Sequence, residues 1–131
     1  MPARPLSPHL GVYKISRYTL ATSIFNRFTG VALSVGLLVL VYWVVSVAGG
    51  PRSFARAARV LSLPVMKLAY AGLIVAFCYH LIAGIRHLVW DTGTGLERRH
   101  SQRSAWLVIA VSILLMLAVG YCAWLAGVRT P

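Results

Sequence analysis

The stretch A-F-C-Y-H-L-I-A-G-I-R-H-L, residues Ala76–Leu88, decides how this chain is to be interpreted. It places two histidines and an arginine in or beside a segment that is apolar enough to be buried in a membrane. Ionisable side chains are costly inside a bilayer, so they mark functional sites there. His80 and His87 are seven residues apart, which is two helical turns, and they therefore share one helix face.

The face that carries His80 is otherwise built from small residues. These are Ala69, Gly72, Ala76 and Gly84. Small side chains let a flat group or another helix backbone approach closely. We interpret this face as the wall of a cofactor pocket, with His80 as the ligand of its iron. The residues alone leave two alternatives open, a histidine hydrogen-bonded to a neighbouring helix and a proton-relay residue.

The composition indicates an all-α membrane protein. Of 131 residues, 59% are hydrophobic, and three apolar runs each reach the roughly 20 residues that a spanning helix needs. The net charge of +11 does not indicate a nucleic-acid partner, because the cations sit at helix ends and in short loops, where topology and anionic headgroups of the lipid bilayer explain them. The two cysteines, Cys78 and Cys122, form no C-x-x-C or C-x-x-C-H pattern, so we expect no zinc site or covalently attached haem.

We expect one membrane-anchor domain over residues 1–131, with an amphipathic or extended N-terminal arm. The arm is predicted over residues 1–22, and the spanning helices over about 23–48, 65–90 and 105–126. Gly49-Gly50-Pro51 is a strong helix breaker. The segment after it, Pro51–Pro64, interleaves three arginines with apolar residues and predicts a short amphipathic helix at the membrane surface. Residues 95–104 are expected to form a charged loop.

The distribution of cations predicts a cytoplasmic N-terminus. With three spans, the N-terminus and the second loop share one side, which carries Arg4, Lys14, Arg17, Arg27, Arg86, Arg98, Arg99 and Arg103. The other side carries Arg52, Arg56, Arg59, Lys67 and Arg129. Eight cations against five favour the first side as the inner one. Ser23, Arg27, His87 and Asp91 would then gather near the inner face, with His80 about 16 Å deeper than Asp91.

These positions suit haem b and a quinone. Haem b needs an axial imidazole at depth, small residues beside the ring, and cations for its propionates. His80 and the small face meet the first two needs, and Arg27 and His87 are placed for the third. No second histidine lies at comparable depth in the other spans, so a second axial ligand would come from another polypeptide, or the iron would be five-coordinate.

Ser23 and Arg27 form the second candidate site. They are four residues apart at the membrane edge and share a face, where a hydroxyl and a guanidinium can donate hydrogen bonds to a quinone headgroup. The alternative is that Arg27 simply extends to the lipid headgroups.

Three motifs together resemble one family. R-P-L-S-P-H-L-G-V-Y (Arg4–Tyr13), S-I-F-N-R-F-T-G (Ser23–Gly30) and Y-H-L-I-A-G-I-R-H-L-V-W-D (Tyr79–Asp91) are similar to the cytochrome b subunit of succinate dehydrogenase, respiratory complex II. The resemblance covers all three spans in order. It implies a membrane anchor for the flavoprotein and iron–sulfur subunits on the cytoplasmic face, in the inner membrane of a bacterium rather than of a mitochondrion.

The resemblance also assigns residues. His80 falls on the family's axial haem ligand, and the second ligand would come from a companion small membrane-anchor subunit. Ser23 and Arg27 fall on the family's quinone contacts, and Arg27 and His87 on the propionate side of the haem. The chain would contribute to ubiquinone reduction while holding no succinate site, flavin or iron–sulfur cluster of its own.

One position departs from the family pattern. The family usually has histidine immediately before the motif arginine, and this chain has Asn26. Asparagine can donate a hydrogen bond to a propionate or quinone oxygen but cannot carry charge, so we expect the haem edge to be held differently here. The alternatives to the succinate dehydrogenase function are the anchor of a menaquinone-linked fumarate reductase and a non-redox structural membrane subunit.

Overall fold

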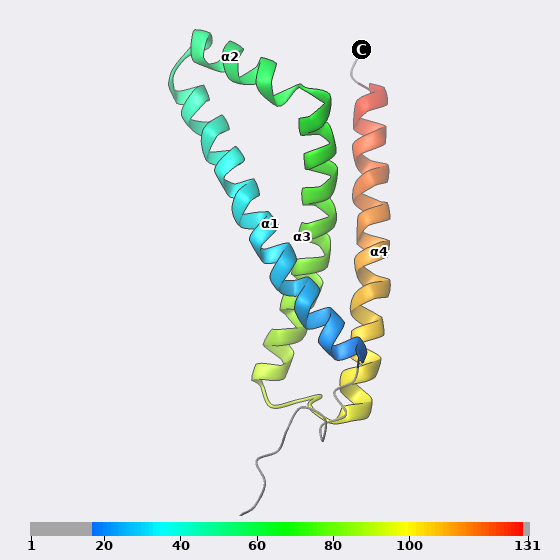
Figure 1. Ribbon diagram of the computed structural model, residues 1–131. Coiled ribbons are helices and arrows are strands. Elements are labelled where there is room, and N and C mark those ends of the chain that lie inside the picture. Colours follow the sequence, from blue (N-terminus) through cyan, green and yellow to red (C-terminus); the bar gives the residue numbers. More distant parts are fainter. Residues whose placement is uncertain (1–16, 130–131) are drawn as a thin grey trace, which may run out of the picture.

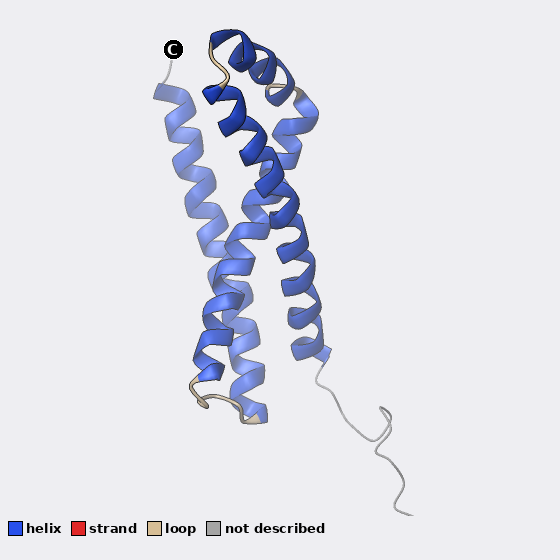
Figure 2. Cartoon of the chain, turned by 90° about the vertical axis from the view of Figure 1, so that its left-hand side faces the viewer, coloured by secondary structure: helices blue, strands red, loops and turns tan. Residues whose placement is uncertain are grey.

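The structure of the chain, a computed structural model, describes residues 17–129. Within this range the chain forms four helices, which are α1 (Arg17–Ala48), α2 (Pro51–Leu61), α3 (Pro64–Asp91) and α4 (Arg98–Arg129). The described residues contain three helical segments long and apolar enough to cross a membrane, which are Leu20–Ala48, Pro64–Asp91 and Arg99–Gly127. The expected all-α membrane fold is therefore confirmed, and short loops connect the helices (Figure 2).

The three long helices converge at one end of the bundle. α1 crosses α3 obliquely, α4 runs alongside α3, and α2 bridges the end of α1 and the start of α3 (Figure 1). The beginning of α1, the last turns of α3 and the beginning of α4 meet at the end opposite α2. The motif residues of α1 and α3 lie toward this end.

Two helices begin earlier than the hydropathy pattern predicted. α1 begins at Arg17, inside the expected arm 1–22, and α4 begins at Arg98, inside the expected loop 95–104. Hydropathy reports where a bilayer would begin, whereas a helix can continue through polar residues beyond that point. The segment from Arg17 to Thr29 contains no proline, the residue that breaks a helix most strongly. The rest of the arm, with the motif Arg4–Tyr13, lies outside the described residues.

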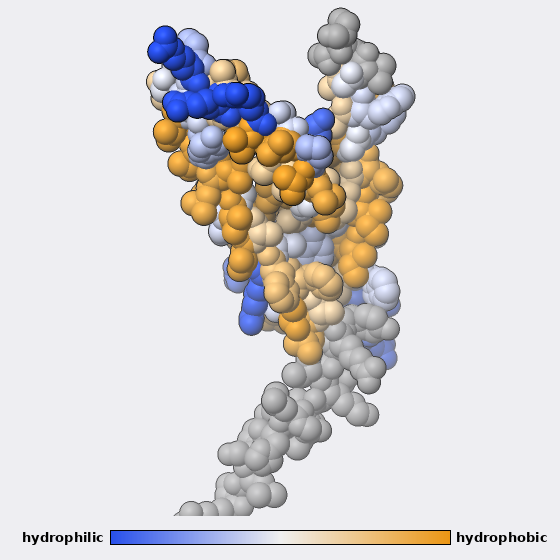
Figure 3. Space-filling model, turned by 45° about the horizontal axis from the view of Figure 1, so that its top comes forward, coloured by the Kyte–Doolittle hydropathy of each residue, from blue (hydrophilic) through white to orange (hydrophobic). Residues whose placement is uncertain are grey.

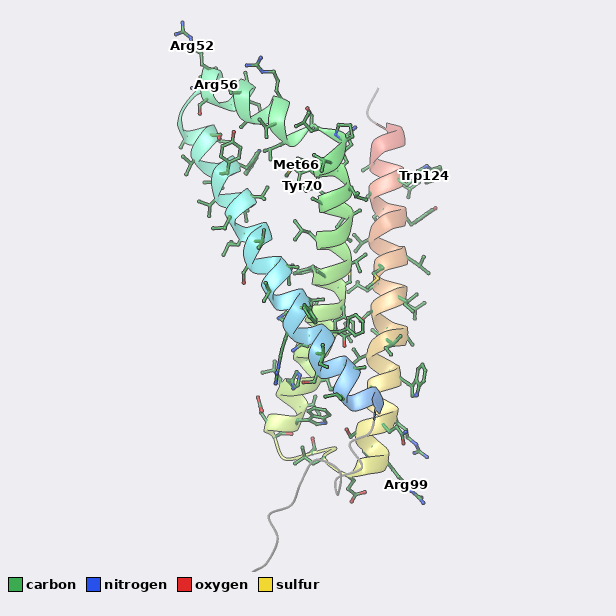
Figure 4. All side chains as sticks on the ribbon, viewed as in Figure 1. Arg52, Arg56, Met66, Tyr70, Arg99 and Trp124 are labelled. Carbon is green, nitrogen blue, oxygen red and sulfur yellow. The ribbon has the colours of Figure 1, made fainter. Side chains whose placement is uncertain are left out.

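The predicted amphipathic helix between the first two spans is present as α2. Gly50 adopts a φ of 83°, and Pro51 occupies the first helical turn, so the chain reverses direction at the end of α1. Ala57 is buried, whereas Arg52 and Arg56 project away from the bundle (Figure 4). Figure 3 shows hydrophilic residues gathered at this end above a hydrophobic band on the spans.

Small residues mediate the close packing between the spans. Ala76, Ala83 and Ala105 are buried, which lets helix backbones approach closely. Large apolar side chains such as Phe28, Leu38 and Leu68 remain more than two-thirds exposed. Such side chains face lipid or a partner subunit in a membrane.

Candidate functional site

His80 lies against α1, where its ring contacts one turn of that helix. Its Nδ1 atom is 3.1 Å from the backbone oxygen of Asn26 and 3.2 Å from Oγ1 of Thr29. A carbonyl oxygen can only accept a hydrogen bond, so Nδ1 is the donor toward Asn26. The hydroxyl of Thr29 lies within donating distance of the carbonyls of Phe25 and Asn26, so it can accept from the same ring nitrogen.

This hydrogen bond decides what His80 can do chemically. In a neutral imidazole one nitrogen carries the proton and the other offers a lone pair. Protonation at Nδ1 leaves the lone pair on Nε2, and no side chain or backbone group among the described residues forms a hydrogen bond with that atom. A backbone carbonyl that orients the distal ring nitrogen is the usual support of a metal-binding histidine. The sequence left open the alternative that His80 is hydrogen-bonded to a neighbouring helix. That hydrogen bond is present, and it leaves the lone pair of Nε2 free to bind another group.

The surroundings of His80 are tight at Gly30 of α1 and open at Gly84 of α3. On the α1 side, a methyl group at Gly30 would lie 3.1 Å from Cε1 of His80, so only glycine fits without displacing the ring. Gly84 is one helical turn from His80, and a methyl group there would meet nothing within 4 Å. Asn26 adds a buried side-chain oxygen, Oδ1, that has no hydrogen-bond partner in the described chain. The open space at Gly84 fits the edge of a flat prosthetic group, and the Asn26 oxygen can accept a hydrogen bond from a donor on another molecule.

The other predicted site residues lie on the same pair of helices but do not contact His80. Ser23 and His87 are half-buried and Arg27 is exposed. His87 packs edge-on against Trp90, with ring centroids 5.3 Å apart. Ser23 and Arg27 lie one turn apart on α1, and neither makes a hydrogen bond or ion pair with another described residue. The structure therefore joins Asn26 to His80 and leaves Ser23 and Arg27 available to other molecules.

An apolar cleft lies beside α1, on a different side of the helix from the candidate quinone contacts Ser23 and Arg27. It has a volume of about 400 Å³ and is lined by Thr22, Phe25 and Thr29 of α1 together with residues of α3 and α4. At 100° per residue, the middle of this lining lies on the side of α1 opposite Ser23 and Arg27. The two candidate quinone contacts therefore do not face the cleft.

Among the described residues classed as buried, Arg86 is the charged one, and the sequence reasoning gave it no role in a site. Only 8% of its surface is exposed, and its guanidinium lies 4.0 Å from the centroid of the Trp90 ring. It donates hydrogen bonds to Thr22 of α1 and to Ser101 and Ser104 of α4. The sequence indicates a buried role for Arg86, because an arginine within an apolar run is unusual. Arg86 was counted from the sequence only as a cation at the membrane edge, and that role was therefore missed.

Comparison with known protein families identifies the chain. The family model described as "Succinate dehydrogenase/Fumarate reductase transmembrane subunit" matches residues 1–119. The chain belongs to this family. The match covers the first two membrane spans, most of the third and the segment upstream of α1, and it includes all three sequence motifs.

Individual members of the family are similar over most of their length. The succinate dehydrogenase cytochrome b556 subunit of Paracoccus denitrificans is 40% identical over 112 residues, 86% of this chain and 85% of that one. The corresponding subunit of Rickettsia typhi is 38% identical over 114 residues, 87% of this chain and 88% of that one. The human mitochondrial cytochrome b560 subunit is 34% identical over 113 residues, 85% of this chain and 66% of the human one.

These matches support the succinate dehydrogenase function over the fumarate reductase alternative. The relatives named above are all cytochrome b subunits of succinate dehydrogenase. The chain is therefore a membrane-anchor subunit of that oxidoreductase complex.

Proposed function

We propose that this chain binds haem b through His80 and contributes Ser23 and Arg27 to the site at which ubiquinone is reduced. The observation that carries the proposal is the hydrogen bond from Nδ1 of His80 to the backbone oxygen of Asn26, 3.1 Å long, which orients the ring with Nε2 free. The bacterial and human relatives are named as cytochromes b, which supports the same ligand.

Different residues around His80 would contact different parts of haem b. His80 would supply an axial nitrogen, and the open side of Gly84 would receive the edge of the ring. The side-chain nitrogen of Asn26, which can donate a hydrogen bond, and the side chains of Arg27 and His87 would lie toward the propionates. When bound, haem b supplies one-electron transfer chemistry, and its potential is set by the axial ligands and the polarity of this pocket.

Ser23 and Arg27 are proposed to bind the quinone headgroup. A serine hydroxyl can donate to one quinone oxygen, and a guanidinium can stabilise the negative charge that develops as electrons arrive. Both residues lie on the first turns of α1, near one end of the span Leu20–Ala48. A headgroup bound at this level leaves its isoprenoid tail free to lie among lipid chains.

The haem site is completed by partner subunits. Among the described residues, His87 and His100 lie toward the polar end of α3 and at the start of α4, away from the depth of His80. We therefore propose that a second small membrane-anchor subunit supplies the other axial ligand. The iron–sulfur and flavoprotein subunits would bind at the cytoplasmic face of the bacterial inner membrane, on the side of the N-terminus.

A difference spectrum of the purified complete complex tests the haem proposal. We expect a reduced-minus-oxidised b-type band in the parent complex and its loss in His80→Ala. His100→Ala is the matched control, because His100 is exposed on α4 and its Nε2 atom lies 3.9 Å from a carboxylate oxygen of Glu97. A parent complex without the band, or a band that survives in His80→Ala, would reject the assignment and favour a structural subunit.

A further inference from the structure

Arg86 carries a positive charge inside the bundle with no carboxylate beside it. Within the part of the chain that the structure describes, the one ion pair joins His100 and Glu97, and Arg86 takes no part in it. A cation buried in a spanning helix is costly, so its retention calls for a function. Its hydrogen bonds show which parts of the molecule depend on it.

The guanidinium of Arg86 ties all three spans together. Nη1 donates to Oγ1 of Thr22 on α1 over 3.1 Å. Nε donates to Oγ of Ser104 over 2.9 Å, and Nη2 donates to the backbone oxygen of Ser101 over 2.8 Å, both on α4. One side chain thus fixes the beginning of α1 and the beginning of α4 against the last turns of α3.

Thr22 is held a second time by α3. The hydroxyl of Tyr79 donates to the backbone oxygen of Thr22 over 2.9 Å. Arg86 therefore binds the side chain of Thr22, and Tyr79 binds its backbone oxygen. The two hydrogen bonds together restrict both sliding and rotation of α1 on α3. Thr22 immediately precedes Ser23, and Tyr79 immediately precedes His80. The register set at Thr22 consequently decides where Ser23, Arg27 and Asn26 lie relative to His80.

We propose that Arg86 is a positioning residue for the quinone and haem sites. Through Thr22 it holds the first turns of α1 so that Ser23 and Arg27 meet the quinone headgroup and the Asn26 carbonyl meets Nδ1 of His80. This inference rests on the proposed function, which concerns the residues that touch the ligands. Arg86 touches neither ligand in this arrangement and acts through α1.

The geometry explains why arginine occupies this position. Its planar fork presents five donors in fixed directions and can reach acceptors on two helices at once, whereas a lysine ammonium is a compact point charge on a flexible stem. Arg86→Lys should therefore retain part of the function, and Arg86→Gln should retain less. A control substitution is Arg103→Gln on the exposed surface of α4.

The experiment measures quinone reduction by the purified complete complex against succinate oxidation with a water-soluble dye that bypasses the quinone site. We expect kcat/KM for quinone to fall about tenfold to a hundredfold in Arg86→Gln, since small misplacements of reacting groups cost this much. The dye activity should stay at the parent level, the b-type band should shift or weaken, and Arg86→Lys should fall between the two. Arg103→Gln should match the parent.

A second pair of variants tests the same inference if the complex with Arg86→Gln does not assemble. Thr22→Val removes the acceptor on α1, and Ser104→Ala removes one on α4. If Arg86 acts through α1, Thr22→Val lowers quinone kcat/KM and Ser104→Ala does not. Equal quinone kinetics and an unchanged haem band in all assembled variants, with only a lower melting temperature, would overturn the inference. A parent complex without haem or quinone activity would instead overturn the proposed function.

Discussion

The contact between His80 and Gly30 makes the orientation of the imidazole sensitive to a single methyl group. The ideal Cβ position at Gly30 lies 3.1 Å from Cε1 and 3.7 Å from Nδ1 of His80. The first distance is shorter than an ordinary carbon–carbon contact of about 3.5–4.0 Å, so the ring must move to accept a side chain. Movement of the ring lengthens the bond from Nδ1 to Asn26.

We predict that Gly30→Ala weakens or shifts the b-type band of the complex. The control is Gly120→Ala on α4, where a methyl group meets nothing within 4 Å. Both substitutions gain about 1 kcal/mol of helix propensity, so their difference isolates the contact with His80. Optical spectra at equal protein concentration provide the measurement, and indistinguishable spectra for the two variants would contradict the proposed orientation of His80.

Arg27 is predicted to matter for quinone reduction more than for haem retention. Its side chain is exposed on the first turns of α1, and the proposed function assigns the axial position to His80. In Arg27→Ala we expect quinone kcat/KM to fall about a hundredfold to a thousandfold, the range seen when one charge-stabilising donor is removed. The b-type band should persist. Parent-level quinone kinetics in this variant would favour the alternative in which Arg27 only reaches the lipid headgroups.

At the scale of the helices, Gly36 of α1 lies directly against the side chain of Leu73 on α3. A Cβ placed there would lie 2.6 Å from Cδ2 of Leu73. A leucine at position 36 would compete with Leu73 for the same space, and such overpacking costs about 1–3 kcal/mol. We predict that Gly36→Leu lowers the temperature at which the complex dissociates. Gly120→Leu on α4 is the control, because a Cβ there has open space, and equal dissociation temperatures would contradict this packing.

Sequence reasoning predicted the helices better than their ends and contacts. Runs of apolar residues predicted three spans, and the glycine–proline breaker with interleaved arginines predicted α2. The start of α1 at Arg17 was missed because hydropathy reports bilayer depth rather than backbone hydrogen bonding. Helical periodicity predicted that His80 shares a face with small residues, because that inference needs only one helix.

The contacts of Arg86 were beyond such reasoning for a different reason. Its acceptors Thr22, Ser101 and Ser104 lie 64, 15 and 18 residues away in the chain. No spacing rule within a single helix connects them. The same holds for His80 and Asn26, which are 54 residues apart. Candidate site residues could be selected from the pattern of a single span. Their hydrogen-bond partners could not, because these depend on how the spans cross.

For the molecule as a whole, charge is distributed unevenly between the two ends. The described residues include two acidic side chains, Asp91 and Glu97, and both lie at the end where α1 and α4 begin. The opposite end carries the exposed arginines of α2, Arg52, Arg56 and Arg59. Orientation in the membrane then depends on the cations, because acidic residues contribute little to the positive-inside rule.

The eight cations on the side of the N-terminus, against five on the other, predict that α2 faces the periplasm. Arg52 and Arg99 lie at opposite ends of the bundle and are both exposed (Figure 4), so cysteines at these positions report the two sides. In intact cells, with Cys122→Ser as background, a membrane-impermeant maleimide should label Arg52→Cys and spare Arg99→Cys until the cells are broken. The reverse pattern would place the Ser23 and Arg27 end outside. Electrons from a cytoplasmic iron–sulfur subunit would then have to cross the span to reach the quinone, so this labelling also tests whether the proposed site lies where its electron donor can reach it.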